Sequence, residues 1–279
     1  EQVTCFLKQL AKRLDVAVTL IRNDEWQKEN GFSVLKARGV IEKPFLLLMA
    51  DHLFDPAIIR SLQKQPFNEG EVLLAVDTDK NNPLIDMEDV TKVCIKDGHI
   101  INIGKTIDDF SGFDTGLFLC TPAIFEALDR VCKIHNDATL SAAIRVLAEN
   151  KHAKSVQTKR FWIDVDDEKA YQKAEKTLLD SLQGKSNDGP VARWLNRPIS
   201  TRLSKILVNF NITPNQISCF SFILSMIAAG LFALDSYWFL ALGGIIAQFA
   251  SIIDGSDGEV ARLKYLSSDY GGWFDAVLD

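Results

Sequence analysis

The apolar residues of this chain follow different patterns before and after about Gln216. Up to about residue 185, charged and apolar positions mix as in a soluble domain, and runs such as KPFLLLMAD and GEVLLAVDT end in polar residues. Such runs predict buried strands of an α/β domain. After Gln216, residues 217–234 and 237–253 contain no charged residue. The pattern therefore predicts a soluble domain followed by two apolar helices.

Each of the two apolar runs is long enough for a bilayer-spanning helix, which needs roughly 17–25 residues. Buried core helices are the alternative, and a cleaved signal peptide is excluded because both runs lie far from the N-terminus. Basic residues flank the outer ends of the pair and are absent from the turn between the runs, which predicts that both outer ends are cytoplasmic. We therefore expect a multi-pass protein of the cell membrane. The flanking basic residues are Arg193, Arg197, Arg202, Lys205, Arg262 and Lys264.

Composition adds little to this picture. The 279 residues have a formal net charge of -6, which suits one or two globular domains, and we expect no nucleic-acid partner. The five cysteines are scattered, and Cys219 lies inside a predicted span. This spacing predicts neither a zinc site nor a disulfide framework, as expected for a reducing cytosol.

Residues 184–211 connect the two predicted parts, after a soluble domain at 1–183. GKSNDGP has the composition of a linker, and residues 191–210 alternate basic and apolar positions at near-helical spacing. We expect an amphipathic helix on the anionic inner leaflet. A surface helix packed on the soluble domain is the alternative.

Four aspartates follow the second apolar run. Asp254 and Asp257 are three residues apart and share one face of a helical extension of that run, and Asp275 and Asp279 share a face of a helix that begins at about residue 270. Small residues near them allow the two helices to approach closely. Four carboxylates in a small volume need cations, and hard oxygen ligands select Mg²⁺ or Mn²⁺. We expect two ions that hold a phosphate ester during displacement, although acidic side chains that merely cap helices are the alternative.

The spacing D-x2-D-G-x2-A-R-x8-G-x3-D-x3-D is complete between Asp254 and Asp279. It resembles the signature of the CDP-alcohol phosphotransferases, integral membrane enzymes in which an alcohol displaces CMP from a CDP-linked donor. The resemblance implies that Asp254, Asp257 and Asp275 bind metal, and that Asp279 binds metal or acts as the general base. The implied donor-binding residues are Asp254, Asp257, Gly258, Ala261 and Gly271, and Arg262 is the candidate for binding the acceptor phosphate. Because the family has six membrane helices, we expect residues 212–279 to be the start of an all-α membrane domain that is incomplete at its C-terminus.

The soluble domain has its own candidate site. The strand at 45–49 places Asp51 at its C-terminal end, where ligands bind in open α/β sheets. A second strand at 161–165 exposes Asp164 and Asp166 before a helix, and one of them completes a two-carboxylate magnesium site with Asp51 in this interpretation. Plain solvent exposure is the alternative. Lys105 is a candidate cation for a phosphate, although a single lysine is more often a surface residue.

LLLMADHLFDP, GKTIDDFSGFDTGLF and FWIDVDDEKAYQKAE together resemble the sugar-phosphate nucleotidyltransferases, which have a Rossmann-like α/β fold. The resemblance implies Mg²⁺ on Asp51 and on Asp164 or Asp166, and a catalytic contact of Lys105 with the substrate phosphate. The glycine-rich, arginine-containing loop of that family is not found in this sequence. We therefore expect the domain to be incomplete at its N-terminus.

The fusion of the two domains resembles bifunctional inositol-phosphate enzymes of heat-loving archaea and bacteria. It implies that CTP and inositol-1-phosphate give CDP-inositol, and that a second inositol-1-phosphate then displaces CMP to form the precursor of a compatible solute. A homodimer through the membrane helices is also implied. The alternatives are a phospholipid-forming transferase with a non-catalytic soluble domain, and a membrane-anchored nucleotide sensor. The sequence leaves open the acceptor, its stereochemistry and the preferred metal.

Overall fold

The computed structural model describes residues 2–135, 138–182, 189, 192–264 and 266–278. The chain divides into two compact units, Glu1–Ala174 and Glu175–Asp279, and each is described by itself. The boundary lies inside helix α6 (Glu168–Leu182). The predicted linker around residues 184–190 lies outside the described residues except for Gly189, which is exposed.

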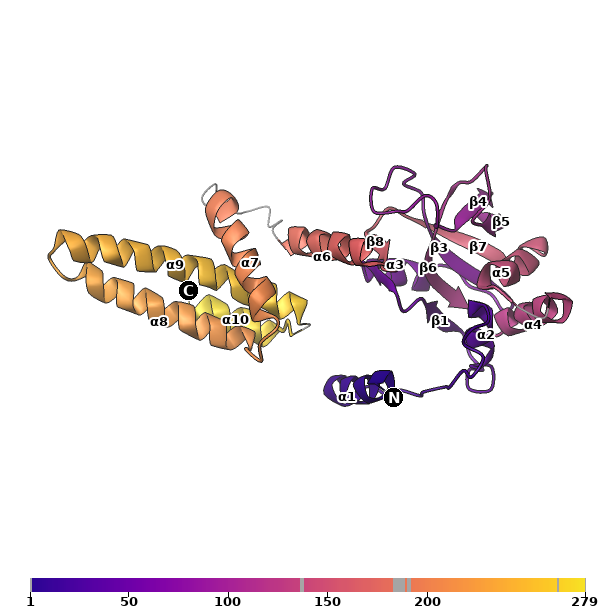
Figure 1. The fold of residues 1–279 in the computed structure, drawn as a ribbon, viewed down its shortest axis with the longest axis horizontal. Helices are drawn as coiled ribbons and strands as arrows, with labels where there is room; N and C mark the ends of the chain where they lie inside the picture. The colour runs from indigo at the N-terminus through magenta and orange to yellow at the C-terminus, as the bar shows by residue number, and fades with distance from the viewer. Residues whose placement is uncertain (1, 136–137, 183–188, 190–191, 265, 279) are drawn as a thin grey trace. The chain divides into compact units, whose positions relative to one another are not determined.

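Unit 1 is an α/β domain (Figure 1). Its main sheet has six strands in the order β1-β6-β3-β7-β5-β4, in which β3 and β7 are parallel and the other pairs are antiparallel. A separate ribbon pairs β2 with β8. The strands are β1 (Phe45–Leu48), β2 (His52–Phe54), β3 (Val72–Asp77), β4 (Lys92–Lys96), β5 (His99–Gly104), β6 (Gly112–Cys120), β7 (Ala153–Thr158) and β8 (Trp162–Asp164).

The core of unit 1 lies on both faces of β3. Every residue of this strand is buried, which explains its continuous apolar run. Successive side chains point to opposite faces, so Val72 and Leu74 pack under α4 and α5, whereas Leu73 packs against α3. The helices of unit 1 are α1 (Gln2–Leu14), α2 (Asn30–Leu35), α3 (Ala57–Gln63), α4 (Ala123–His135) and α5 (Leu140–Glu149).

Two aspartates cap helices in unit 1. Asp55 accepts a hydrogen bond of 2.8 Å from the Ala57 N–H, and Asp167 accepts one of 2.6 Å from the Ala170 N–H. These side chains satisfy donors at the starts of α3 and α6 that have no partner within the helix. Their capping roles leave Asp51, Asp164 and Asp166 as the acidic residues of these segments that are available for a site.

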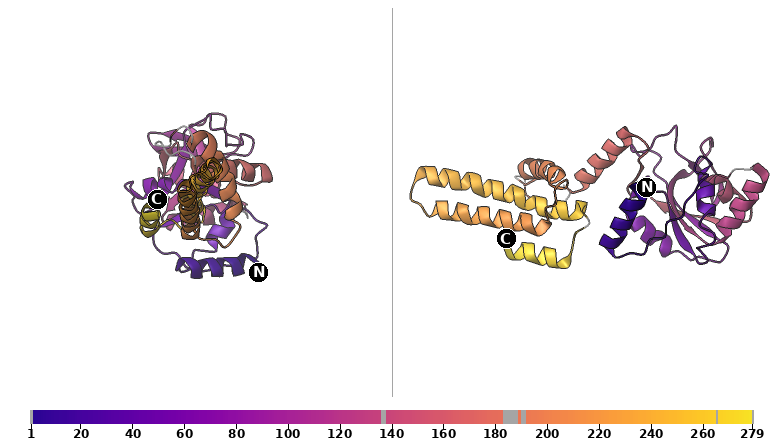
Figure 2. Two further views of the ribbon diagram at one scale, coloured as in Figure 1. Left: turned by 90° about the vertical axis from the view of Figure 1, so that its left-hand side faces the viewer. Right: turned by 60° about the horizontal axis from the view of Figure 1, so that its bottom comes forward.

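Unit 2 is helical (Figures 1 and 2). Its elements are the π-helix η1 (Ala192–Asn196), α7 (Arg197–Leu207), α8 (Pro214–Phe232), α9 (Tyr237–Leu263) and α10 (Asp269–Leu278). Helices α8 and α9 form an antiparallel pair, and α10 packs against α8. Thr213 and Gln216 form a capping box that begins α8 in the segment ITPNQIS. Gly243 permits close contact of the pair, because a Cβ there would lie 2.8 Å from the Phe232 ring.

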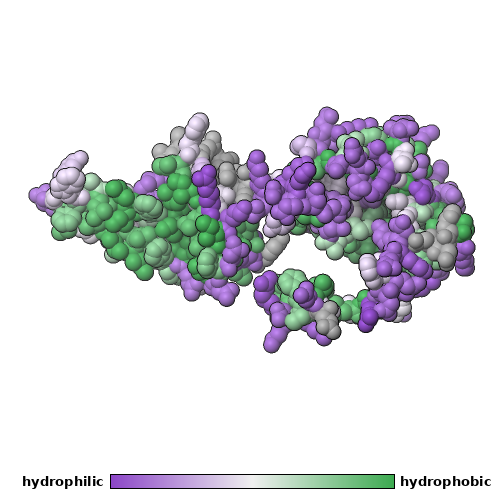
Figure 3. Space-filling view, viewed as in Figure 1, coloured by the Kyte–Doolittle hydropathy of each residue, from purple (hydrophilic) through white to green (hydrophobic). Residues whose placement is uncertain are grey.

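Helices α8 and α9 are each long and apolar enough to cross a membrane. Only 22% of the apolar window of each helix is buried, so most of the apolar surface is exposed, as the green surface over α8 and α9 shows (Figure 3). A soluble core helix would hide this surface. Helix α9 continues past the expected end of the second span at residue 253 and carries the acidic motif in its last turns.

Helix α7 buries polar side chains and exposes apolar ones. Ser200, Thr201 and Ser204 are buried against α9, whereas Ile199 and Ile206 are exposed. Within unit 2, α7 therefore packs on α9 through its polar face. The outward apolar face retains the character expected of a helix that contacts lipid.

Candidate active sites

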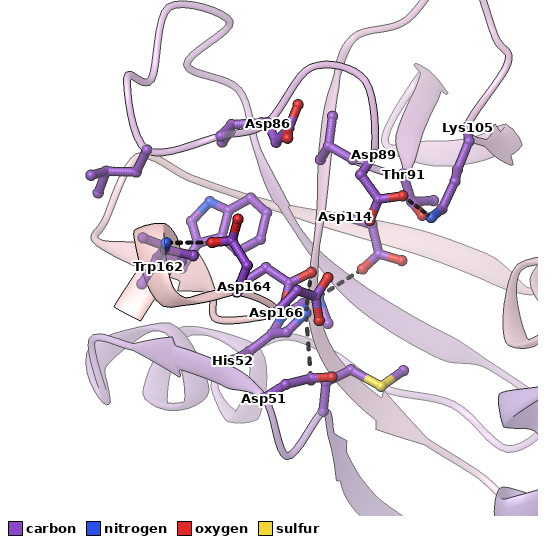
Figure 4. A pocket seen from close by; sticks show the side chains of 18 of the residues that line it. Asp51, His52, Asp86, Asp89, Thr91, Lys105, Asp114, Trp162, Asp164 and Asp166 are labelled. Atoms are coloured by element: carbon purple, nitrogen blue, oxygen red, sulfur yellow. Dashed lines mark hydrogen bonds and ion pairs between the residues drawn. The ribbon is translucent and has the colours of Figure 1, made fainter. Parts of the chain in front are cut away.

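Pairing of the short ribbon creates the first candidate site. His52 lies opposite Asp164 in the β2–β8 register, and the Val165 N–H donates to the Asp51 carbonyl at 3.0 Å. Asp51 and Asp164 are far apart in sequence, yet this pairing brings both to one cleft. Asp166 follows two residues later and lines the same cleft (Figure 4). The structure thus brings Asp51 close to Asp164, one of the two partners expected from the sequence, and places Asp166 in the same cleft.

The cleft has a volume of about 610 Å³ and contains charges of both signs. Lys105, which directly follows β5, lines it and forms an ion pair of 2.5 Å with Asp89 (Figure 4). Lys169 and Lys173 lie on the rim contributed by the first turns of α6. The cleft therefore offers carboxylates for a cation and ammonium groups for a phosphate within one cavity.

Trp162 supports the floor of this cleft. Its indole N–H donates to Asp77 at 2.9 Å, and Asp77 also accepts from the Asn82 side chain at 2.9 Å. Both Trp162 and Asp77 are almost fully buried. The buried carboxylate of β3 thereby fastens β8, and with it Asp164, to the main sheet.

His52 lies between the acidic side chains of the cleft. Its Nδ1 contacts the Thr115 carbonyl at 2.7 Å, and its Nε2 lies 3.5 Å from Asp164 and 3.8 Å from Asp51. Burial opposes its charge, but the Asp164 hydrogen bond, the Thr115 carbonyl and both carboxylates together raise the pKa of His52 to about 9. Nδ1 therefore donates to Thr115, and the ring neutralises part of the local negative charge.

Two carboxylates of the cleft have raised pKa values. Burial raises the pKa of Asp114 to about 6, against the opposing effects of the Gly116 N–H and His52. Burial, and then the charges of Asp164, Asp51 and Asp89, raise the pKa of Asp166. Burial raises both pKa values, neighbouring like charges add to the effect at Asp166, and a cation bound among the carboxylates would lower these pKa values.

The donor set of the cleft fits a hard divalent cation. Oxygens of Asp89, Asp164 and Asp166 lie within 4.8 Å of one another, and an oxygen of Asp51 lies within 4.8 Å of one of Asp164. One oxygen of Asp164, Oδ1, is buried and has no hydrogen-bond partner within the described residues. A buried carboxylate oxygen without a donor is costly unless a cation binds it.

The second candidate site lies in unit 2, where α9 and α10 bring the predicted aspartates together. Carboxylate oxygens of Asp254, Asp257 and Asp275 lie within 4.8 Å of one another. Asp254 and Asp257 share one face of α9, as their spacing predicts, and Asp275 belongs to α10. This all-oxygen donor set also fits Mg²⁺ or Mn²⁺. Asp279, the fourth aspartate, lies outside the described residues.

Two serines of α8 orient these carboxylates. Ser218 donates to Asp257 at 2.5 Å, and Ser221 donates to Asp254 at 3.1 Å. Both hydroxyls are buried. Outer hydrogen bonds of this kind hold metal ligands in one orientation.

The small residues of the motif border the same region. A Cβ at Gly258 would lie 3.3 Å from Arg262 Nη1, and one at Gly271 would lie 3.2 Å from Ser268 Oγ. Ala261 is half-buried and Arg262 is exposed. These nearest neighbours belong to the glycines' own helices or their starts, and a Cβ at Gly271 would also lie 3.8 Å from Asn215 Oδ1 of α8; the close approach of the two motif helices stays a prediction.

The sequence did not predict every residue of these sites. His52 and Asp89 in the cleft, and Ser218 and Ser221 on α8, were not predicted. The available signal for His52 was its place directly after Asp51. Serines spaced three apart on an apolar helix, one turn after its start, gave the corresponding signal on α8.

The sequence model of the CDP-alcohol phosphatidyltransferase family matches residues 211–279. An Aquifex aeolicus protein named bifunctional IPC transferase and DIPP synthase is 35% identical over 274 residues, which are 98% of this chain and 60% of that protein. An Archaeoglobus fulgidus protein of the same name is 32% identical over 260 residues, 93% of this chain and 50% of that protein. The chain thus spans between 50% and 60% of the length of these two relatives.

A solved structure agrees with the fold of unit 1. The inositol-1-phosphate CTP transferase from T. maritima has a TM-score of 0.52 and 24% sequence identity, over 58% of this chain and 66% of that chain. At this identity the likeness concerns the fold. The chain therefore combines a unit with a fold like that of this structure and C-terminal residues 211–279 that match the model of the CDP-alcohol phosphatidyltransferase family.

Proposed function

We propose that this chain carries the sites of two successive reactions, synthesis of CDP-inositol and transfer of its phosphoinositol group to a second inositol-1-phosphate. The observation that carries the proposal is the convergence of Asp254, Asp257 and Asp275 beside an apolar helix pair, in a chain whose other unit has its own acidic cleft. The names of the relatives support the same pair of reactions.

In the first reaction, a phosphate oxygen of inositol-1-phosphate attacks the α-phosphorus of CTP, and the bond to the departing pyrophosphate breaks. Asp51, Asp164 and Asp166 would hold Mg²⁺, which when bound offsets the charge of the triphosphate. Lys105 is suited to bind the attacking phosphate once its ion pair with Asp89 opens. The ammonium group of Lys105 would lower the repulsion between the two anionic substrates.

In the second reaction, a hydroxyl of another inositol-1-phosphate attacks the phosphorus that carries inositol in CDP-inositol. The bond to CMP breaks, and CMP leaves. Asp254, Asp257 and Asp275 would hold two divalent ions, which when bound stabilise the charge on the diphosphate. Asp279 is our candidate for the base that takes the hydroxyl proton, and Arg262 is our candidate for binding the acceptor phosphate. Gly258, Ala261 and Gly271 are our candidates for the positions that leave space for the donor.

The setting of these reactions forms part of the proposal. We infer that α8 and α9 span a cell membrane, that both sites face the cytoplasm, and that α7 lies in the inner leaflet with its apolar face toward lipid. The exposed apolar surfaces of all three helices support this arrangement. We also infer a homodimer formed through the membrane helices.

The test supplies the full-length gene product in liposomes with CTP, inositol-1-phosphate and Mg²⁺, and measures pyrophosphate and CMP separately. We expect both products. Asp51→Ala should abolish pyrophosphate, whereas Asp279→Asn should abolish CMP alone. Asp55→Ala is the matched control, because Asp55 is a nearby carboxylate that caps α3.

Other outcomes would replace the proposal. Absence of pyrophosphate, with CMP release from added CDP-inositol, would contradict the first reaction. CMP release from CDP-diacylglycerol instead of CDP-inositol would identify a phospholipid-forming enzyme. Binding of a CDP ligand without release of CMP from either donor would favour the sensor.

A further inference from the structure

Helix α9 carries a third carboxylate, Glu259, that the proposed reactions do not use. The side chain of Glu259 is fully buried, and it lies one residue after Gly258 in the acidic motif. Residues two apart on a helix are about 200° apart around its axis. Asp257 therefore contacts α8, while Glu259 contacts α7 from the opposite side of α9.

Three donors from one face of α7 meet this carboxylate. Arg197 Nη1 lies 3.2 Å and Ser200 Oγ 2.9 Å from Oε1, and Ser204 Oγ lies 2.8 Å from Oε2. The Arg197 side chain is only 12% exposed, so both members of the ion pair are shielded from water. A single carboxylate thus fixes α7 both along and around the axis of α9.

The packing around Glu259 allows this close approach. Ser256 is fully buried against α7, and a Cβ at Gly255 would be in van der Waals contact with Arg197 and Ser200. Removing two charges from water is costly, and an apolar pair of equal volume is often at least as stable. A contribution to stability therefore explains this hydrogen-bonded ion pair poorly. Fixing the register of α7 on α9 explains it better.

We propose that Glu259 is a positioning residue that locks α7 onto the back of the motif helix and thereby holds Asp254 and Asp257 in their metal-binding orientation. The inference rests on the proposed function of the membrane site. It adds a residue outside the acidic ligand set, and it assigns to α7 a role in the geometry of that site.

The test measures Mn²⁺ binding to the full-length chain in detergent by electron paramagnetic resonance. Asp51→Ala and Asp164→Ala are present throughout, so that the membrane site dominates the signal. We expect Glu259→Gln to weaken Mn²⁺ binding at least roughly ten-fold, because the neutral amide cannot satisfy all three donors. Unchanged Mn²⁺ affinity in a folded Glu259→Gln variant would overturn the inference.

Gln248→Leu is the matched control. Gln248 donates to Asn196 at 2.5 Å across the interface between η1 and α9, about three turns from Glu259. The substitution should lower the melting temperature but leave the Mn²⁺ affinity within about two-fold of that of the parent. A two-fold change in affinity corresponds to less free energy than one hydrogen bond contributes. An equal loss of Mn²⁺ affinity in both variants would show general loosening of the helices and would overturn the inference.

A milder variant covers the case in which Glu259→Gln does not fold. Ser204→Ala removes one of the three donors, and we expect Mn²⁺ binding to weaken roughly two- to five-fold. No change would overturn the inference.

The Mn²⁺ measurement requires no turnover, so the two proposals fail separately. Mn²⁺ binding that depends on Glu259, without CMP release from CDP-inositol, would contradict the proposed reaction and retain the positioning role. CMP release together with Mn²⁺ binding that is insensitive to Glu259→Gln would do the reverse. A parent chain that binds no Mn²⁺ would overturn both.

Discussion

Gly116 offers a sharp test of the cleft, because it is packed directly against His52. Its φ is +72°, in the left-handed region that favours glycine. A Cβ at this position would be 2.9 Å from Met49 Cγ, and it would clash with the His52 ring at less than van der Waals distance. Gly116→Ala should therefore push His52 away from Thr115, Asp164 and Asp51.

The free energy lost on Gly116→Ala has two contributions. An alanine in left-handed backbone costs about 1–2 kcal/mol. Loss of the 2.7 Å hydrogen bond from His52 to Thr115 costs about 1.5–3 kcal/mol, because the raised pKa of His52 keeps its ring charged near neutral pH. Gly98→Ala is the matched control. Gly98 has φ +79°, and a Cβ added there would meet nothing within 4 Å, so this variant carries the backbone term alone.

Hydrogen exchange of peptides from β6, measured by mass spectrometry, reports the local opening free energy of unit 1 in the full-length chain. We expect Gly116→Ala to lower it by about 1.5–3 kcal/mol more than Gly98→Ala does, which is the hydrogen-bond term. We also expect pyrophosphate formation to fall only in Gly116→Ala. Equal effects of the two substitutions on exchange and on activity would refute the packing of His52 against Gly116 as a determinant of the site.

Three further outcomes are expected. Ser218→Ala should weaken Mn²⁺ binding at the membrane site roughly two- to ten-fold, through loss of a hydrogen bond worth about 0.5–1.5 kcal/mol, whereas Ser225→Ala, on an exposed position of the same helix, should not. Gly243→Ala should lower the melting temperature of the helix pair more than Gly244→Ala, which has open space at its Cβ position. Burial opposes the charge of Glu71, but its hydrogen bonds to Lys154 and Asn68 hold its pKa below 4.5. The ionised side chain therefore stabilises the fold above pH 4.5, and this stabilisation is lost as the pH falls. Glu71→Gln should make the free energy of unfolding, measured by urea titration, less dependent on pH in this acidic range.

The local pattern of the sequence carried much of this protein's organisation. Hydrophobic runs predicted β3, α8 and α9, because a strand buried on both faces and a helix that can cross a membrane both require continuous apolar residues. The run at β1 also predicted a strand, but this strand lies at the edge of the sheet and is half-buried rather than buried. The fixed spacing of the acidic motif placed Asp254 and Asp257 on one helix face, since helical periodicity alone determines which residues share a face.

The tertiary structure decided which distant groups meet. The pairing of β2 with β8 brings His52 to Asp164, and no local pattern specifies that register. The polar face of α7 is buried and its apolar face is exposed, although the helical spacing is compatible with either orientation. Glu259 shows the same limit: its sequence neighbours mark it as part of an acidic motif, but the three donors that bind its carboxylate come from another helix. Such long-range contacts depend on how the chain folds back on itself, and only the packed structure determines them.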